Sequence, residues 1–201
     1  GPERNGVSGE TGLLNNWPEA GPTVEWRIPL GRGFSGISIA DGKVYTMYAE
    51  SGDEYAICLN AETGEELWRI RTGPYYQEQQ GGDGPRSTPT VDGATVYVLS
   101  ASGMLYALDI ENGAPQWQKD LVAEFDCEIP KWGFSTSPLV EGDLLLLEAG
   151  GVDGRVRDDA ARPRCLRELG EGPAANSGFL IGGNVRRTKI TKGRCQNPST
   201  R

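Results

Sequence analysis

The chain has 201 residues, of which 28 are acidic and 20 are basic, giving a formal charge of −8 at pH 7. This balance argues against nucleic acid as a partner, because phosphate binding needs clustered lysine and arginine, and no apolar run approaches the roughly 20 residues that a membrane span needs. The chain contains no histidine, which excludes histidine-dependent acid–base catalysis, Ser-His-Asp and Cys-His nucleophilic systems, and haem attachment through Cys-x-x-Cys-His.

Residues 1–22 form a lead-in segment, and residues 23–28 predict a strand that contains Trp26. No other strand-forming segment precedes this strand, and no methionine begins the chain. We therefore expect the sequence to be a piece of a longer protein.

The segment 33–70 predicts a complete unit of four strands. The Asp41-Gly42 pair favours a tight hairpin turn after the first strand, since both central positions of such a turn adopt positive φ. Runs rich in β-branched and aromatic residues favour the other strands. The four strands are expected at 34–40, 43–49, 55–59 and 66–70.

The turn at 60–64 joins the third and fourth strands. The Asn60 side chain can accept hydrogen bonds from turn amides, and Gly64, which follows Thr63, can adopt the left-handed conformation. Trp68 projects from the outer strand, where it is suited to pack against a neighbouring sheet; the alternative is a ligand-stacking platform. The turn resembles a short calcium loop but lacks the alternating acidic ligands and closing glutamate of an EF-hand, so we interpret it as a turn.

The same pattern recurs along the chain. In a second unit, 84–119, Asp109, Gly113 and Trp117 take the places of the asparagine, glycine and tryptophan of the first, and a partial third unit covers 133–151. The tryptophans of the strand at 23–28 and of the two complete units are 42 and then 49 residues apart. This period predicts a propeller, because propeller blades run roughly 40 to 50 residues.

These repeats resemble the pyrroloquinoline-quinone (PQQ) β-propeller repeat family, whose unit ends in an Ala-x-Asp-x-x-Thr-Gly-x-x-x-Trp pattern. The match is close at 59–68 and 107–117, and the resemblance covers roughly residues 4–151. It implies an all-β propeller of four-stranded antiparallel blades with tryptophan-docking motifs, closed as a ring of seven or eight blades. In such rings an isolated outer strand commonly completes the last blade. About two and a half blades are identified at 23–151, so we expect an incomplete propeller.

The family includes quinoprotein dehydrogenases and non-catalytic members such as the outer-membrane assembly lipoprotein. From the resemblance we expect a binding or assembly scaffold with protein partners; the alternative is part of a PQQ-dependent dehydrogenase that oxidises alcohols or sugars. PQQ and calcium are implied by the resemblance alone, and no residue is assigned to bind either. The resemblance also implies an extracytoplasmic or periplasmic location, and no signal peptide is visible.

Two residues are candidates for a functional surface. Arg86 and Trp132 lie just before expected first strands, at positions that face the central channel in a propeller. The alternative is that both pack the loops around the axis.

No catalytic or metal-binding residue is assigned. None of the cysteines is paired at metal-ligand spacing, and no two are adjacent, so neither a zinc site nor a vicinal disulfide is predicted. The glycine-rich run 31–36 fits the Gly-x-Gly-x-x-Gly pattern of dinucleotide-binding proteins, but it leads into a strand instead of a helix. The four cysteines are Cys58, Cys127, Cys165 and Cys195.

The composition changes after residue 151. Residues 1–151 carry nine basic and 23 acidic side chains, whereas 152–201 carry eleven and five. The run 155–165 shows no strand alternation and no tryptophan where a third docking turn is expected. We therefore expect a basic irregular tail, for which a reading-frame error, disorder, and a nucleic-acid- or membrane-binding arm are the alternative explanations.

Overall fold

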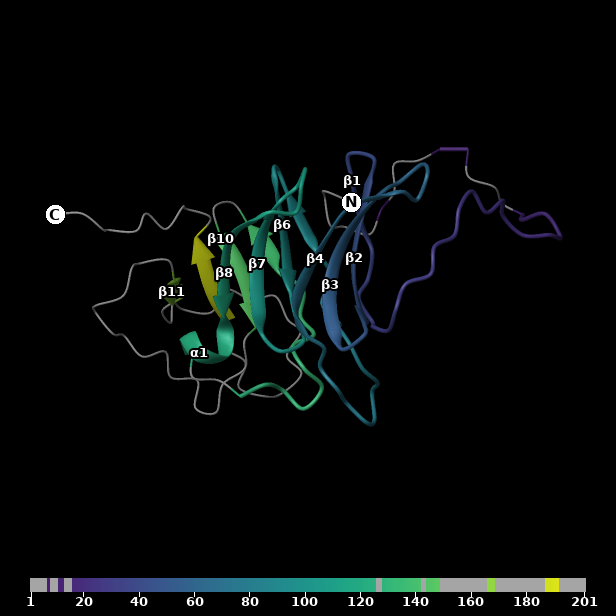
Figure 1. Ribbon diagram of the computed structural model, residues 1–201. Helices are drawn as coiled ribbons and strands as arrows, with labels where there is room; N and C mark the ends of the chain where they lie inside the picture. Colours follow the sequence, from purple (N-terminus) through teal and green to yellow (C-terminus); the bar gives the residue numbers. More distant parts are fainter. Residues whose placement is uncertain are drawn as a thin grey trace.

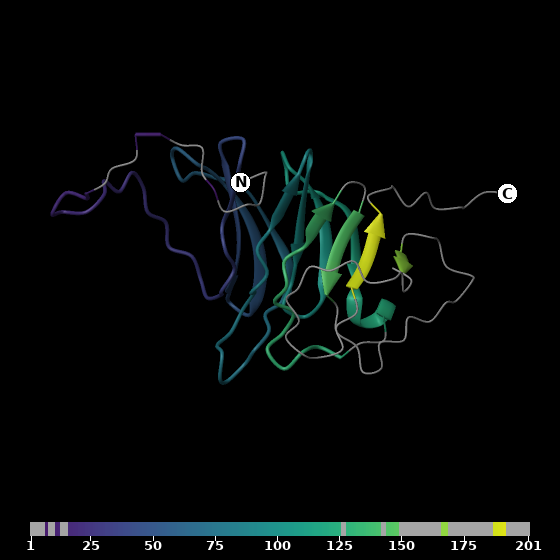
Figure 2. The same cartoon turned by 180° about the vertical axis from the view of Figure 1, so that it is seen from behind.

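The computed structural model describes residues 7, 11–12, 16–125, 128–141, 144–148, 166–168 and 187–191. The described residues form three four-stranded antiparallel sheets that stand side by side in chain order (Figures 1 and 2). The single helix described, α1 (Leu121–Phe125), follows the second sheet. Within the described residues no helix has the length and apolar character needed to cross a membrane.

The first sheet has the strand order β1-β2-β3-β4. As predicted, β1 and β2 are joined by a tight turn, in which Asp41 and Gly42 have φ values of 50° and 70°. The first strand is shorter than expected, because the backbone N–H groups of Phe34 and Gly36 bind the neighbouring segment of the second sheet instead. The strands are β1 (Ser38–Ala40), β2 (Lys43–Glu50), β3 (Asp53–Asn60) and β4 (Glu66–Pro74).

The second sheet repeats this order, and the third is joined by strands from later in the chain. The second comprises β5 (Thr90–Asp92), β6 (Thr95–Leu99), β7 (Met104–Asp109) and β8 (Pro115–Asp120). The third has the order β11-β12-β10-β9, with β9 (Leu139–Glu141), β10 (Leu144–Glu148), β11 (Leu166–Glu168) and β12 (Arg187–Thr191).

The predicted tail, 152–201, is described only at β11 and β12. There β12 pairs antiparallel with β10, which places a basic segment beside the leucine-rich strand of the third sheet. The rest of the tail lies outside the described residues, so its expected irregular character stays a prediction.

The hydrophobic core lies between the sheets. One cluster fills the space between the first and second sheets, and another lies between the second and third. The packing geometry repeats: the rings of Tyr45 and Trp68 are 6.0 Å apart at 47°, and those of Tyr97 and Trp117 are 6.0 Å apart at 46°. The first and second sheets therefore each present the same kind of aromatic pair to the core cluster that they share with the next sheet.

Hydroxyl groups link the innermost strands of successive sheets. The Gly36 N–H donates to Thr88 Oγ1 at 3.1 Å, and the Thr88 N–H in turn donates to Ser137 Oγ at 2.9 Å. Two residues further along, the hydroxyls of Ser38 and Thr90 donate to backbone carbonyl oxygens of the next sheet. This ladder fixes the segments that lead into the first strands, and it thereby positions the candidate site.

Candidate functional site

Two of the repeat tryptophans contact the turn of the sheet that follows them. Trp68 lies in β4, whereas the segment 23–28 that contains Trp26, expected to be a strand, lies outside every strand of the described residues. Trp26 Nε1 donates to the carbonyl oxygen of Ala61 at 2.9 Å, and Trp68 Nε1 donates to that of Ile110 at 3.0 Å. Trp68 is only 7% exposed. Because its faces are covered by protein, this indole has no free surface on which a ligand could stack.

The turns that receive these indoles are built alike. The Asn60 side chain accepts hydrogen bonds from the N–H groups of Glu62 and Thr63, at 2.9 and 3.0 Å. The Asp109 carboxylate binds the two corresponding N–H groups of its own turn. The glycine that ends each turn has a positive φ and lies against an indole, so that an added Cβ would come 2.7 Å from the ring. These glycines are Gly64, against Trp26, and Gly113, against Trp68.

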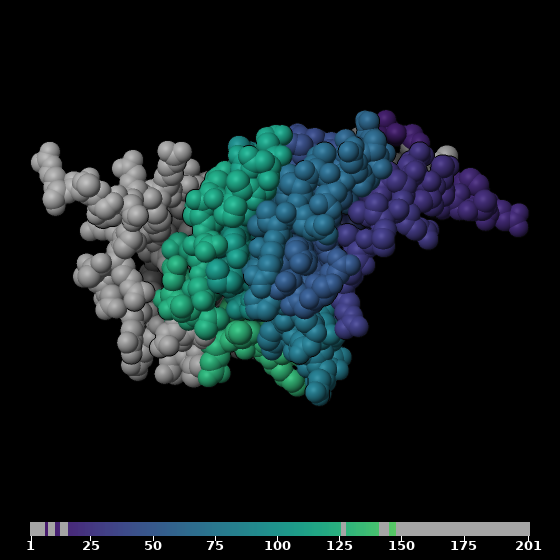
Figure 3. Space-filling model, in the orientation of Figure 1, coloured from purple at the N-terminus to yellow at the C-terminus, as the bar shows by residue number. Residues whose placement is uncertain are grey.

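The segments that lead into β1, β5 and β9 meet at one end of the sheets. In Figures 1 and 3 the segments around residues 75–86 and 128–136 project side by side from this end. We call the group of side chains and glycines gathered there the connector surface. It consists of Phe34, Gly81, Gly82, Arg86, Lys131 and Trp132.

Both candidate residues from the sequence belong to the connector surface. The Arg86 guanidinium donates to the carbonyl oxygens of Gly84 and Gly82, at 2.7 and 2.6 Å, and lies 5.3 Å from the centre of the Phe34 ring. Trp132 is 43% exposed, and its ring packs against Gly81. The sequence did not single out the exposed phenylalanine or the glycine pair, because neither carries a motif by itself.

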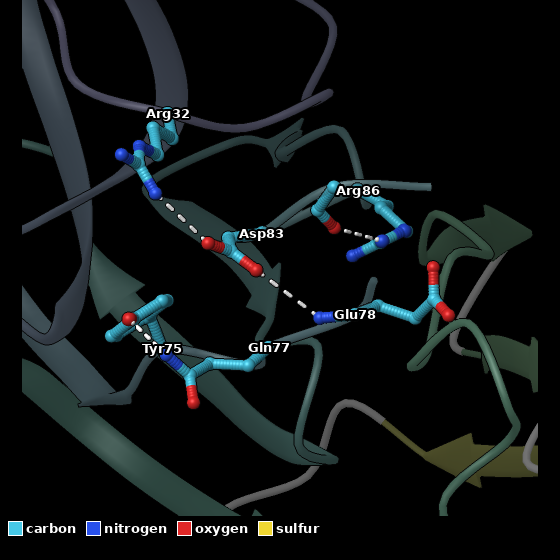
Figure 4. Close-up of polar contacts among 7 residues, drawn as sticks. Arg32, Tyr75, Gln77, Glu78, Asp83 and Arg86 are labelled. Atoms are coloured by element: carbon cyan, nitrogen blue, oxygen red, sulfur yellow. Dashed lines mark hydrogen bonds and ion pairs between the residues drawn. The ribbon is translucent and has the colours of Figure 1, made fainter. Parts of the chain in front are cut away.

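An ion pair and backbone hydrogen bonds hold the 78–83 loop beside this surface (Figure 4). Arg32 Nη1 lies 2.9 Å from Asp83 Oδ2, and Asp83 Oδ1 accepts the Glu78 N–H at 3.2 Å. The Glu78 carboxylate accepts the N–H groups of Gln80, at 2.7 Å, and of Gly81. Both carboxylates are therefore engaged in holding the loop.

Sequence reasoning missed Glu54, which is 0% exposed. Its carboxylate accepts the N–H of Tyr76 at 3.2 Å and that of Ala101 at 3.0 Å, and so joins β3, the connector and the second sheet. Burial raises the pKa of Glu54, against the lowering effect of both N–H groups and of the Arg86 charge. The alternation of β3, which puts this residue on the core side, was the signal that could have revealed it.

Among the described residues, one cysteine could in principle act as a nucleophile. Cys58 is fully buried beside Tyr45, and burial raises the pKa of both groups. Burial of this kind makes a thiol inert instead of nucleophilic. The remaining three cysteines lie outside the described residues.

The quinone and calcium implied by the resemblance would each need ligands from this chain. No group of three or more His, Cys, Asp or Glu side chains in the described part of the chain is placed to hold a metal ion. The carboxylates beside the connector surface are already engaged by backbone N–H groups and Arg32. Two cavities, of about 380 and 350 Å³, lie against Ile28 and Gly31 and are lined by neither Arg86 nor Trp132. The described residues therefore do not fit these groups.

Three solved structures illustrate what the chain is similar to. BamB from Moraxella catarrhalis is 23% identical with a TM-score of 0.41, and the match covers 57% of this chain and 30% of that one. Quinohemoprotein alcohol dehydrogenase from Comamonas testosteroni is 20% identical with a TM-score of 0.46, covering 61% and 18%. A europium-containing methanol dehydrogenase is 18% identical with a TM-score of 0.48, covering 64% and 23%.

The match therefore spans less than a third of the length of each of these proteins. No curated protein sequence matches the chain significantly. The family model described as outer membrane protein assembly factor BamB matches residues 17–162, well over half of the chain and all of the first two sheets. The chain thus belongs to the PQQ-like β-propeller repeat family represented by this assembly factor, and its four-stranded antiparallel sheets are propeller blades.

Proposed function

We propose that the chain acts as a non-catalytic binding scaffold that docks a protein partner on the connector surface. The observation that carries this proposal is the exposure of two aromatic rings beside an arginine: Phe34 is 58% and Trp132 43% exposed, and Arg86 lies over the phenylalanine. Aromatic residues and arginine are enriched at protein interfaces and dominate their binding energy.

The connector surface is also held in place before any partner arrives. The Tyr76 hydroxyl donates to the backbone carbonyl oxygens of Pro130 and Lys131, at 3.3 and 3.0 Å. The Phe34 N–H donates to the carbonyl oxygen of Pro85 at 2.7 Å. A surface fixed in this way loses little conformational entropy on binding, which favours affinity.

The proposal includes a division of labour along the chain. Residues 33–70 and 84–119 are two complete blades and 133–151 is part of a third, while 1–22 is a lead-in. The docked tryptophans and their turn glycines hold the blades together, and Arg86 and Trp132 face the central channel. By family membership we propose an extracytoplasmic or periplasmic location.

Site-specific photo-crosslinking tests the scaffold. A benzoylphenylalanine placed at Phe34 or at Trp132 is expected to give one discrete adduct with the same identified protein in an extract of the source cells. The matched control is the same probe at Trp17, which is 64% exposed but lies in the lead-in segment. Equal adducts from all three positions, or none from the connector positions, would overturn the proposal.

The alternative, a PQQ-dependent dehydrogenase, is separated by a titration with PQQ and calcium. A scaffold predicts no saturable change in the quinone absorbance and no rise in melting temperature. Saturable binding with a stabilised melt would overturn the scaffold and favour the dehydrogenase.

A further inference from the structure

We infer that the connector surface binds an acidic segment of a protein partner that carries aromatic side chains. This inference rests on the scaffold function proposed above and specifies the chemistry of the partner. Three observations carry it: the placement of the cations, the engagement of the nearby carboxylates, and the backing of the exposed rings by glycine.

Both cations of the connector surface lie on aromatic rings. Arg86 Cζ is 5.3 Å from the centre of the Phe34 ring, and Lys131 Nζ is 5.0 Å from the centre of the Trp132 ring. Their hydrogen bonds go to neutral oxygens, two backbone carbonyls and the Gln80 side-chain amide. Neither forms an ion pair with any described residue. Both cations therefore remain available for the carboxylates of a partner.

The acidic side chains of the same loop do not neutralise these cations. Asp83 pairs with Arg32, which lies outside the connector surface, and accepts a backbone N–H of its own loop (Figure 4). Glu78 accepts two further N–H groups of that loop. A partner carboxylate can therefore reach two cations that no described carboxylate pairs with.

The two rings rest on adjacent glycines. An added Cβ would come 3.0 Å from the Phe34 ring at Gly82, whose φ is 88°, and 2.9 Å from the Trp132 ring at Gly81. No side chain can therefore grow between the rings and the loop, which fixes the rings and leaves part of each exposed. Aromatic side chains of a partner can stack on such rings and bury apolar area.

The probe for the test is an acetylated and amidated peptide of alternating Asp and Phe, seven residues long. Isothermal titration into the whole chain is expected to show saturable binding that weakens as salt is raised, because exposed charges are screened. A peptide with Lys in place of Asp, and one with Ala in place of Phe, are expected to bind at least about tenfold more weakly, the factor that loss of one hot-spot contact produces.

Variants locate the binding. Trp132→Ala and Lys131→Glu are each expected to weaken the Asp-Phe peptide about tenfold or more. Glu128→Lys, which reverses an exposed charge in the same segment as Lys131, is expected to tighten it. Trp17→Ala is the matched control for an exposed tryptophan and is expected to change nothing. Melting temperatures of all four proteins show whether the fold is retained.

Three results would overturn the inference: no binding of the acidic peptide, equal binding of the lysine peptide, or binding that Trp132→Ala leaves unchanged in a folded protein. Concentration-dependent self-association of the chain that Trp132→Ala abolishes would show a second copy as the occupant, and would overturn it as well. If the peptide does not bind while photo-crosslinking still gives one partner at the connector positions, the scaffold function is supported and only the proposed chemistry of the partner is wrong. If both fail, both proposals fall.

Discussion

Trp68 Nε1 of the first blade donates a 3.0 Å hydrogen bond to the carbonyl oxygen of Ile110 in the second. The same contact, at 2.9 Å, joins Trp26 to Ala61 at the preceding step of the chain. The sequence repeat is therefore also a repeat of contacts, in which Trp26 and Trp68 each pack on the turn of the blade that follows. Since these contacts fix the blades relative to one another, they also determine how the connector surface is assembled.

Replacing the Trp68 indole by a smaller ring without an N–H should weaken the interface between blades, through the lost donor and the lost buried volume. Trp68→Phe keeps an aromatic ring but leaves the Ile110 carbonyl without its donor, and we expect the free energy of unfolding to fall by about 1 to 3 kcal/mol. Urea denaturation measures this change. Trp17→Phe, at an exposed position, is the control and should stay within about 0.5 kcal/mol of the unaltered protein. Equal effects of the two substitutions would contradict the docking role.

The turn glycines allow backbone strain to be separated from crowding by the indole. Gly42 and Gly113 have nearly the same φ, 70° and 71°, but an added Cβ meets nothing within 4 Å at the first and lies 2.7 Å from the Trp68 ring at the second. Gly42→Ala should cost about 1 kcal/mol through its conformation alone. Gly113→Ala should lower the free energy of unfolding by clearly more than Gly42→Ala does in the same urea denaturation experiment.

The excess cost at Gly113 should disappear when Trp68 is itself changed to alanine, because the crowded ring is then gone. If Gly113→Ala costs no more than Gly42→Ala in the unaltered protein, the close packing of indole on glycine does not limit stability.

The buried carboxyl group of Glu54 should make the free energy of unfolding depend on pH in a defined direction. Burial raises its pKa in the folded state above the ordinary value of 4.5. The folded state therefore holds this proton more tightly than the unfolded state, so the stabilising contribution is complete below about pH 4.5 and is lost as the pH rises through the folded-state pKa. Unfolding free energies measured across this range should fall more steeply with pH for the unaltered protein than for Glu54→Gln.

The Glu54→Gln substitution also lowers the free energy of unfolding by an amount that does not depend on pH. The glutamine amide NH₂ must face one of the two backbone N–H groups, of Tyr76 or Ala101, that the carboxylate accepts. That cost does not vary with pH, so the difference in slope is the informative quantity. Parallel stability curves would show that Glu54 does not titrate differently in the folded state.

The hydrogen bonds of the hydroxyl ladder should contribute measurably to the free energy of unfolding. Thr88→Val preserves the shape of the side chain but removes the acceptor of the Gly36 N–H, at an expected cost of about 0.5 to 1.5 kcal/mol. Thr23→Val, at an exposed position just after the lead-in, serves as the control in the same urea titration. If the two variants unfold at the same urea concentration, the hydroxyl hydrogen bonds do not stabilise the protein and packing alone holds these segments together.

Local chemistry was sufficient to predict the turns and most of the strands of the first blade, but the strand expected at 23–28 does not form. Asp41-Gly42 specifies its hairpin because both residues tolerate positive φ, and the turn that ends in Gly64 specifies the approach to the outer strand. The segment 34–37 has strand propensity but lies outside β1, because Phe34 and Gly36 find their hydrogen-bond partners in the next blade. Such competition is set by tertiary structure, which a propensity does not contain.

The candidate site was only half accessible from the sequence. Arg86 and Trp132 stand out by residue type and by their place before a strand. Phe34 and the Gly81-Gly82 pair acquire their role only when segments about 50 residues apart are brought together. Glu54 is hidden for a related reason, since one of its two partners belongs to the second blade.

Exchange of the indole N–H protons, followed by NMR on the whole chain, tests the interlocking of the blades most directly. The account predicts slow exchange for Trp26 and Trp68, whose N–H groups are bound to backbone carbonyls, and fast exchange for the exposed Trp17 and Trp132. Trp68→Phe should remove the slow resonance of Trp68. Equally fast exchange at all four positions would contradict the docking of each blade on the next.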